Sequence, residues 1–226
     1  MKKLACLLTV VFLSFGATAA FAQSAKFAAE ASKLTAFQQP IGTLNWTTVL
    51  QTTIKTPNKK DLLVGASFQT GLYTQTQVKG KNGSTTTATA NATLKVRLLV
   101  DGDIAYPGDV VYDARSQTLT ATLGGVIESC KDLNGDGVII VKDECVVTDE
   151  MIELILSTMA AHHYNFVYAN LTPGTHTVEV QVNIATPDGT VTDGNSASAW
   201  ATFGPGSLTV EEVRATNIPD GITFSQ

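Results

Sequence analysis

The sequence predicts an all-β protein, built as a two-sheet sandwich of the jelly-roll type with one helix. Segments rich in Val, Leu, Thr and Tyr recur from residue 41 onward, and short clusters of turn-forming residues separate them. Charged residues make up only 15% of the chain, which suits an extracellular β protein. A chain of about 200 residues can also bury one core of sandwich size. These three observations agree on a single sandwich.

The expected strands show the alternation of a half-buried sheet. In the segment 94–100, every second residue is Leu or Val, and Lys95 and Arg97 lie between them. Successive side chains of a strand point to opposite faces, so this pattern places one face in a core and the other near water. The segment 175–184 alternates in the same way. The full set of expected strands is 41–56, 61–79, 85–100, 104–112, 117–127, 164–170, 175–184, 197–203 and 207–213.

One helix is expected after residue 148. Thr148 is a suitable N-cap, and Asp149 and Glu150 favour the positive end of a helix dipole. Six of the next nine residues, 151–159, are apolar. We therefore expect a helix over 149–162, in which a charge at residue 155 would cost several kcal/mol because it would be buried without a partner. The side chains expected to pack onto the sandwich are Ile152, Ile155, Leu156 and Met159.

The N-terminal residues have the pattern of a bacterial secretory signal peptide. Lys2 and Lys3 give a basic start, residues 4–15 form an apolar run, and Ala20-Phe21-Ala22 is a small-x-small cleavage site. We therefore expect a secreted protein, either periplasmic or extracellular. The expected organisation is a signal peptide over 1–22, a linker or short helix over 23–40, and one β-sandwich domain over 41–226 with a loop-helix insertion at 130–163.

Composition argues against two classes of partner. The formal net charge is −5, and no basic cluster is longer than Lys59-Lys60, so nucleic acid is not an expected ligand. Beyond the signal peptide, no segment approaches the ~20 apolar residues that a membrane span needs. A glycan or another protein remains as the expected partner.

Residues 130–145 carry the one motif that indicates specific site chemistry. Between two cysteines, the residues from Asp132 to Asp143 read D-x-N-x-D-G-x-I-x-x-x-D. Calcium takes six to eight oxygen ligands, so carboxylates and amides must recur at alternate positions as a twelve-residue loop curls. Gly137 stands at position six, where the sharp turn needs a residue without Cβ. The expected ligands of one Ca²⁺ are the side chains of Asp132, Asn134, Asp136 and Asp143 and the carbonyl of Val138.

This loop resembles the calcium loops of EF-hand proteins, and most closely those of the dockerin type. Dockerin loops use D-x-N-x-D-G with an aspartate in the last place, as residues 132–143 do. The resemblance implies calcium coordination at the matched positions, but it covers only twelve of 226 residues and does not imply cohesin binding. The other residues indicate no family. The alternative is that Asn134-Gly135 or Asp136-Gly137 only marks a tight turn in a solvated acidic loop.

Cys130 and Cys145 are the only cysteines after the signal peptide, and such a pair in an oxidising compartment predicts one disulfide. Closing a loop of about fifteen residues stabilises a protein by ~3 kcal/mol. At about 1 mM calcium, a site with a Kd of about 10⁻⁴–10⁻³ M contributes only ~0.4–1.4 kcal/mol. The disulfide should therefore dominate the order of the loop, with calcium as a structural brace.

No catalytic motif stands out, since G-x-S-x-G, H-E-x-x-H and phosphate-loop patterns are absent from the sequence. We therefore expect a secreted, non-enzymatic, calcium-braced module that binds a glycan, a surface or a protein. One alternative is a carbohydrate-active hydrolase or lyase on a jelly-roll scaffold, which exposed aromatics and paired acids would favour. Another is a subunit of an extracellular assembly, which an unpaired edge strand would favour.

The remaining candidate residues have simpler expected roles. His162 and His163 fall at the end of the expected helix, where histidines commonly meet the last carbonyls, and we do not expect them to form a metal site with His176. Trp46 and Trp200 are expected in the core. The acids available for a catalytic pair are Asp109, Asp113, Glu128, Glu179, Glu211 and Glu212.

Overall fold

The computed structural model describes residues 26–32, 45–185, 190–191 and 195–214. The expected signal peptide and most of the expected linker lie outside these residues. Within the described part of the chain nearly every element is a strand, and no helix has the length and apolar character needed to cross a membrane. The prediction of an all-β fold is confirmed.

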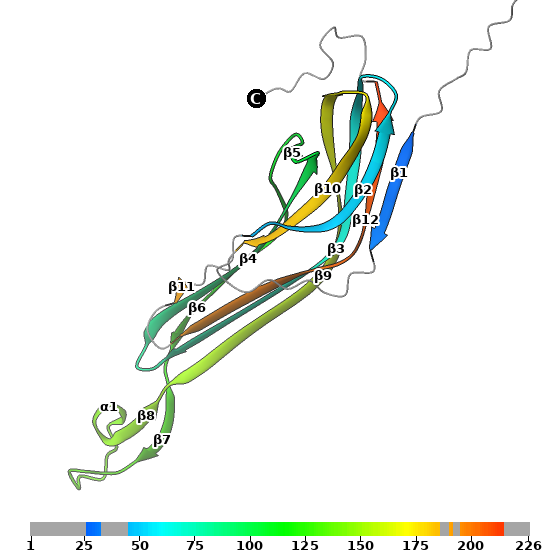
Figure 1. Ribbon diagram of the computed structural model, residues 1–226. Coiled ribbons are helices and arrows are strands. Elements are labelled where there is room, and N and C mark those ends of the chain that lie inside the picture. The colour runs from blue at the N-terminus through cyan, green and yellow to red at the C-terminus, as the bar shows by residue number, and fades with distance from the viewer. Residues whose placement is uncertain (1–25, 33–44, 186–189, 192–194, 215–226) are drawn as a thin grey trace, which may run out of the picture.

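Two antiparallel sheets form the body of the molecule (Figure 1). In order across the first sheet, the strands are β1 (Phe27–Ser32), β12 (Ser196–Val213), β3 (Lys60–Gly80) and β9 (Glu150–Leu171). The second sheet contains β11 (Thr190–Val191), β4 (Ser84–Val100), β10 (Gly174–Ala185) and β2 (Thr47–Thr56), and β5 (Asp103–Ile104) and β6 (Val110–Leu123) also pair with β4. A third sheet has two strands, β7 (Val126–Cys130) and β8 (Cys145–Thr148), with the short helix α1 (Val141–Glu144) between them in the chain.

The strand pairing is nested. Strand β4 pairs with β6, β3 with β9, β2 with β10, and β1 with β12, always antiparallel. The chain therefore behaves as one long hairpin whose two arms stay paired while they wrap into two facing sheets. This wrapped hairpin is the jelly-roll arrangement, so the predicted architecture is confirmed.

The core lies between the two sheets and follows the expected alternation. Leu94 and Val96 of β4 and Val180 of β10 are fully buried from one side. Val64 of β3 and Leu208 of β12 meet them from the other sheet, and they are also fully buried. Burial of these branched side chains stabilises each by roughly 1.5–3 kcal/mol relative to exposure.

Between this core and a small apolar cluster around Val78, the interior is polar. Thr70, Thr74 and Thr76 of β3 are almost fully buried there. Thr74 donates to the Gln117 side chain at 2.5 Å, Gln117 donates to Thr76 at 2.7 Å, and Thr70 donates to Asp113 at 2.6 Å. These buried groups are satisfied by one another, so hydrogen bonds rather than apolar burial hold this part together.

The helix expected over 149–162 is wrong, because these residues belong to strand β9. From Glu150 to His162 they pair with β3, in register from Gly80 back to Phe68. The apolar residues of this segment follow neither a helical nor a strand period strictly, so the pattern is compatible with a helix or a strand. Strand β3, with 21 residues, is long enough to pair with the whole segment. Tertiary pairing therefore overrides the local capping signals.

Three other regions differ from expectation. The expected strands 104–112 and 117–127 are divided differently, because β6 runs without a break through residues 113–116 and residues 126–130 form β7. Described residues of the expected linker or short helix form β1, which pairs with β12. The expected strands 197–203 and 207–213 form the single strand β12, interrupted by a bulge in which Gly204 and Pro205 face Gln69. A bulge inserts extra residues on one strand and bends it without ending the pairing.

Candidate functional site

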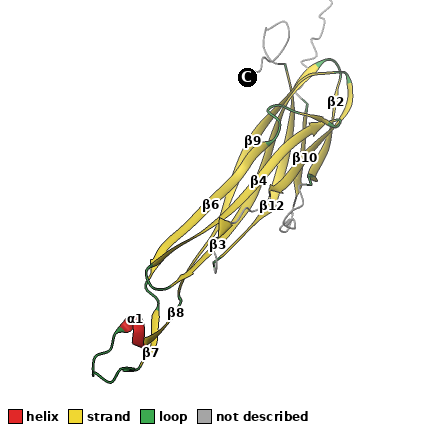
Figure 2. Ribbon diagram, turned by 90° about the vertical axis from the view of Figure 1, so that its left-hand side faces the viewer, coloured by secondary structure: helices red, strands yellow, loops and turns green. Residues whose placement is uncertain are grey.

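A hairpin projects from one end of the sandwich (Figures 1 and 2). We call residues 126–148 the tip; they comprise β7, the calcium-type loop, α1 and β8. Cys130 and Cys145 lie directly opposite each other in the register of β7 and β8, with 4.1 Å between their Cα atoms, and they are disulfide-bonded. The predicted disulfide is confirmed, and it closes the loop 131–144 at its base.

Hydrogen bonds to Asp132 wind the first half of the loop. The carboxylate accepts the backbone N–H groups of Gly135 at 2.5 Å and Gly137 at 2.8 Å. Both glycines have a positive φ, 76° and 78°, which L side chains adopt only with strain. The bonds from Gly137 and Gly135 lower the pKa of Asp132, because they stabilise the charged carboxylate.

Asn134 and Asp136, the next two expected ligands, also accept backbone N–H groups two residues further along the loop. The Asn134 side-chain oxygen accepts the N–H of Asp136 at 2.9 Å, and the Asp136 carboxylate accepts the N–H of Val138 at 2.7 Å. The Asn134 amide also donates to the Asp136 carboxylate at 2.8 Å. The structure therefore brings Asn134 and Asp136 together and leaves the Val138 side chain exposed.

Glu144 joins the two halves of the loop by hydrogen bonds, a role that the sequence analysis did not predict. Its carboxylate accepts the N–H of Leu133 at 3.0 Å and the N–H of Ile140 at 2.8 Å, and the residue is only 8% exposed. The bonds from Ile140 and Leu133 lower the pKa of Glu144. The only signal in the sequence is the position of this acid, directly before the closing Cys145, where it can reach across the loop.

Asp143, the expected final ligand, lies in α1, and its backbone N–H donates to Ile140 at 3.0 Å. Among the described residues, no group of three or more His, Cys, Asp or Glu side chains is arranged to hold a metal ion. Asp143 is thus not gathered with Asp132 and Asp136 into such a group. In the first half of the loop, oxygens recur at alternate positions, as calcium coordination requires. In the second half, Asp143 would have to turn inward to complete the coordination.

The tip and the adjoining half of β9 expose many large apolar side chains. We call these side chains the apolar surface. Met159 is 71% exposed, Leu133 68% and Ile155 49%, although the sequence predicts that Ile155 and Met159 pack onto the sandwich. Strand β9 is also the last strand of its sheet. The members of the apolar surface are Val126, Ile127, Leu133, Val138, Ile139, Ile140, Val141, Val146, Met151, Ile152, Leu154, Ile155, Leu156 and Met159.

The three histidines lie in separate environments. His162 is 3.4 Å from Asp113, His176 is 2.6 Å from Asp101, and His163 contacts a serine of β3. Desolvation by burial acts to raise the pKa of Asp101. The hydrogen bonds that Asp101 makes with the His176 side chain and with the backbone N–H of Thr177 have the larger combined effect, so the pKa is lowered. The histidines thus serve local pairing on strands, not a helix end.

One tryptophan lies at the surface, against expectation. Trp200 is 45% exposed and stacks on Tyr73, with 4.9 Å between ring centroids. Trp46 lies beneath the Arg97 guanidinium, which is 4.3 Å from the ring centroid. Both arrangements place an aromatic ring against a neighbour on the sheet.

The tip lies at one end of the molecule (Figure 2). It contains the sequence motif and the disulfide, and it shares the apolar surface with the adjoining half of β9. The candidate site is this end of the molecule. It consists of the loop 131–144, which the disulfide closes and whose first half is acidic, and of the edge strand β9 with its exposed apolar side chains. No protein-family model, curated protein or solved structure matches this chain.

Proposed function

We propose that this protein is a secreted, non-enzymatic β-sandwich module that joins an extracellular assembly by binding other copies of itself. The single observation that carries the proposal is the apolar surface on the tip and β9. Contiguous exposed apolar patches are uncommon on soluble monomers and mark sites of association. An edge strand with such side chains is a natural place for another chain to pack.

The sequence of β9 supports a second copy as the occupant. Residues 151–159 read Met-Ile-Glu-Leu-Ile-Leu-Ser-Thr-Met and are nearly symmetric about Ile155. A two-fold contact centred on Ile155 brings Met151 of one copy opposite Met159 of the other. It also places Glu153 opposite Ser157, so no like charges meet. Such an isologous contact uses the same patch on both subunits.

The acidic loop has a supporting role in this proposal. Calcium held by Asp132, Asn134 and Asp136, with Asp143 turned inward and the Val138 carbonyl, would fix the shape of the tip. The disulfide already closes the loop, so the metal would refine the order of the apolar side chains in the loop rather than create it. Calcium would thereby strengthen association.

The alternative of a carbohydrate-active hydrolase or lyase has less support. Three of the available acids are engaged with other groups: Asp113 with Thr70, Glu179 with Thr48, and Glu212 with Lys60. These contacts serve the packing of the sandwich. A catalytic pair of carboxylates would instead face each other across a few ångströms of open cleft.

Sedimentation velocity on the purified secreted chain tests self-association. We expect the mean sedimentation coefficient to rise with protein concentration. A double variant, Ile155→Asp with Met159→Asp, should stay monomeric, because two buried like charges would oppose each other across the contact. The matched control is the double variant Val111→Asp with Ile104→Asp, which adds the same two charges at exposed apolar positions on β6 and β5, 60% and 53% exposed.

The outcomes separate clearly. Association that persists in the control and disappears in the double variant supports the proposal. A wild-type chain that sediments as a monomer at all concentrations, with and without calcium, contradicts it.

Calorimetric titration with calcium tests the loop itself. We expect one site with a Kd of about 10⁻⁴–10⁻³ M and poor competition by magnesium, which demands a tighter and more regular shell. Asp136→Ala should abolish the binding, while Asp149→Ala, an exposed acid just outside the loop, should leave it unchanged. Absence of binding up to several millimolar calcium would leave the solvated acidic turn as the correct interpretation.

A further inference from the structure

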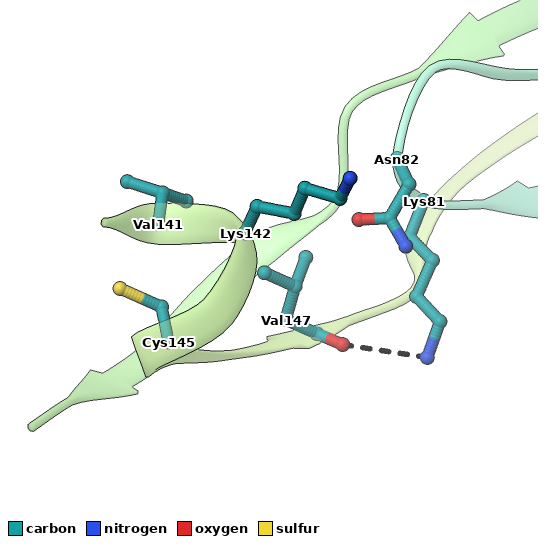
Figure 3. Close-up of a pocket in the computed structure, with 6 residues that line it drawn as sticks. All are labelled: Lys81, Asn82, Val141, Lys142, Cys145 and Val147. Carbon is teal, nitrogen blue, oxygen red and sulfur yellow. Dashed lines mark hydrogen bonds between the residues drawn. The ribbon is translucent and has the colours of Figure 1, made fainter. Parts of the chain in front are cut away.

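A pocket of about 700 Å³ lies at the joint between the tip and the sandwich (Figure 3). The turn between β3 and β4 contributes Lys81 and Asn82, and the backbone N–H of Asn82 is tied to Gly124 at 2.9 Å. The tip contributes residues of α1 and β8. The volume falls within the range of small-ligand sites, about 300–1,000 Å³. The lining residues are Lys81, Asn82, Val141, Lys142, Cys145 and Val147.

The walls of the pocket differ in chemistry. Lys142 reaches from α1 toward Asn82, while Lys81 extends from the same turn as Asn82 toward the Val147 carbonyl (Figure 3). Three side chains with N–H donors thus line the pocket. The side chains of Val141, Val147 and the disulfide-bonded Cys145 supply apolar surface. Such a site offers hydrogen bonds to one end of a ligand and apolar contact to the other.

Among the described residues, no acid forms a salt bridge with either ammonium group. Salt bridges within the described residues join Lys60 to Glu212 and two histidines to aspartates, and neither Lys81 nor Lys142 takes part. Within the part of the chain that the structure describes, the one hydrogen bond of the Lys81 ammonium goes to the backbone carbonyl of Val147 in the tip, at a long 3.4 Å. Two uncompensated cations beside one pocket, in a chain of net charge −5, favour an anionic ligand.

We propose that this pocket binds an aliphatic carboxylate, a ligand that goes beyond self-association. The carboxylate lies between Lys81, Lys142 and the Asn82 amide, where charge-assisted hydrogen bonds are strong. Its hydrocarbon chain packs on Val141, Val147 and the disulfide. An acidic sugar fits less well, because its hydroxyl groups would lose water against these apolar side chains without new partners.

Calorimetric titration of the full chain with octanoate tests the proposal. We expect saturable binding, with octanamide at least about tenfold weaker because it lacks the charge. Lys81→Ala and Lys142→Ala should each weaken octanoate binding by about tenfold. Lys59→Ala, an exposed lysine in the turn between β2 and β3, is the matched control and should change nothing.

Two further ligands identify the source of the carboxylate. Octanoate represents a free aliphatic acid, and acetyl-leucyl-valine represents a peptide that ends in a carboxylate. Binding of either supports the proposal, and the tighter one names the source. Glucuronate that binds more tightly than both overturns it, as does equal affinity for octanoate and octanamide or unchanged affinity in both lysine variants.

The double variant Ile155→Asp with Met159→Asp separates this inference from the proposed function. It should lose self-association and keep octanoate affinity, because neither residue lines the pocket. Loss of octanoate binding in this variant, with the lysine variants unaffected, would place the ligand on the apolar surface instead and overturn the pocket assignment.

Discussion

Tyr112 of β6 holds the two sheets together through one hydroxyl group. The hydroxyl accepts the backbone N–H of Phe68 at 2.9 Å and lies 2.5 Å from the carbonyl oxygen of His162 and 3.1 Å from that of Ala66. The residue is only 7% exposed. It thus supplies partners to backbone groups beside the bulge of β12, where the regular ladder is interrupted.

Replacing Tyr112 with phenylalanine should lower the free energy of unfolding by about 1–3 kcal/mol, because buried backbone groups would lose their partner. Urea denaturation of both proteins measures the difference. The matched control is Tyr73→Phe, which removes a hydroxyl whose partner is a surface glutamine side chain. Equal midpoints for wild type and Tyr112→Phe would contradict the role given to this hydroxyl.

Tyr112 should also make the protein sensitive to alkali. Burial raises its pKa from 10.0 to about 12. Since the folded pKa is higher than the unfolded one, the contribution to stability is complete below pH 10 and is lost as the pH rises through about 12. Urea midpoints measured from pH 8 to 12 should fall more steeply in the wild type than in Tyr112→Phe. Parallel curves would show that this phenol does not titrate differently on folding.

Ile155 is exposed on β9, so a charge there should be tolerated by the monomer. We expect Ile155→Asp to cost no more than about 1.5 kcal/mol, mainly from the poor strand propensity of Asp. The comparison is Val78→Asp on the neighbouring β3, where the side chain is fully buried and a charge should cost several kcal/mol. Thermal unfolding at low protein concentration measures both. Similar losses for the two variants would mean that Ile155 is covered within the monomer.

At the scale of elements, the loop 131–144 is held by two carboxylates whose pKa values lie below their usual range. Asp132 accepts N–H bonds from Gly137 and Gly135, and Glu144 accepts them from Ile140 and Leu133. Each group binds its proton less readily when folded than when unfolded. Their contribution to loop order is therefore complete above the unfolded pKa values, 3.8 and 4.5, and is lost as the pH falls through the lower folded values.

Acid should accordingly loosen the loop before it affects the sandwich. NMR spectra recorded from pH 6 down to pH 2 should show the amide signals of Gly137 and Ile140 moving toward random-coil positions below pH 4. The amide signals of Val96 and Val180 in the core should stay dispersed over the same range. Glu144→Gln should weaken the loop near pH 6 and should matter less as the pH falls, because the wild-type carboxyl then also loses its charge. A loop that stays ordered at pH 2 would contradict the assignment.

At the scale of the whole molecule, the tip and the sandwich are separate packing units. Strands β7 and β8 pair only with each other among the described strands, and the sandwich core lies in the two larger sheets. Gly124 and Gly125 connect the tip to β6, and a Cβ at Gly125 would clash with Val147 and Lys81. The backbone at Gly125 is therefore packed closely against Val147 and Lys81, beside the pocket at the joint.

Reduction of the disulfide should affect the tip alone. Its loop-closure contribution of ~3 kcal/mol acts on residues 131–144, which share no core with the sandwich. Hydrogen exchange followed by mass spectrometry, with and without reductant, should show faster exchange over 126–148 and unchanged exchange in β3 and β10. Faster exchange throughout the sandwich would show that the two units unfold together.

The sequence by itself determined the β character of most of the chain. Alternation in segments such as 94–100 and 175–184 has only one structural meaning, because period-two burial belongs to a sheet. It also determined the disulfide and the winding of residues 132–138, since both depend on local spacing and on glycines at fixed offsets. These features need only neighbours that are close in the sequence.

Only the tertiary structure decided the state of residues 149–162. An apolar segment without a period satisfies a helix or a strand, and pairing with the long strand β3 selects the strand. The same pairing decided that Ile155 and Met159 stay exposed, because the register places them opposite Gln75 and Gly71, on the face of the sheet away from the buried Thr74 and Thr76. Both outcomes depend on a partner strand distant in the sequence, so no local pattern could predict them. The role of Glu144 depends on a shorter separation, but the carboxylate can bridge the loop only after its two ends have met.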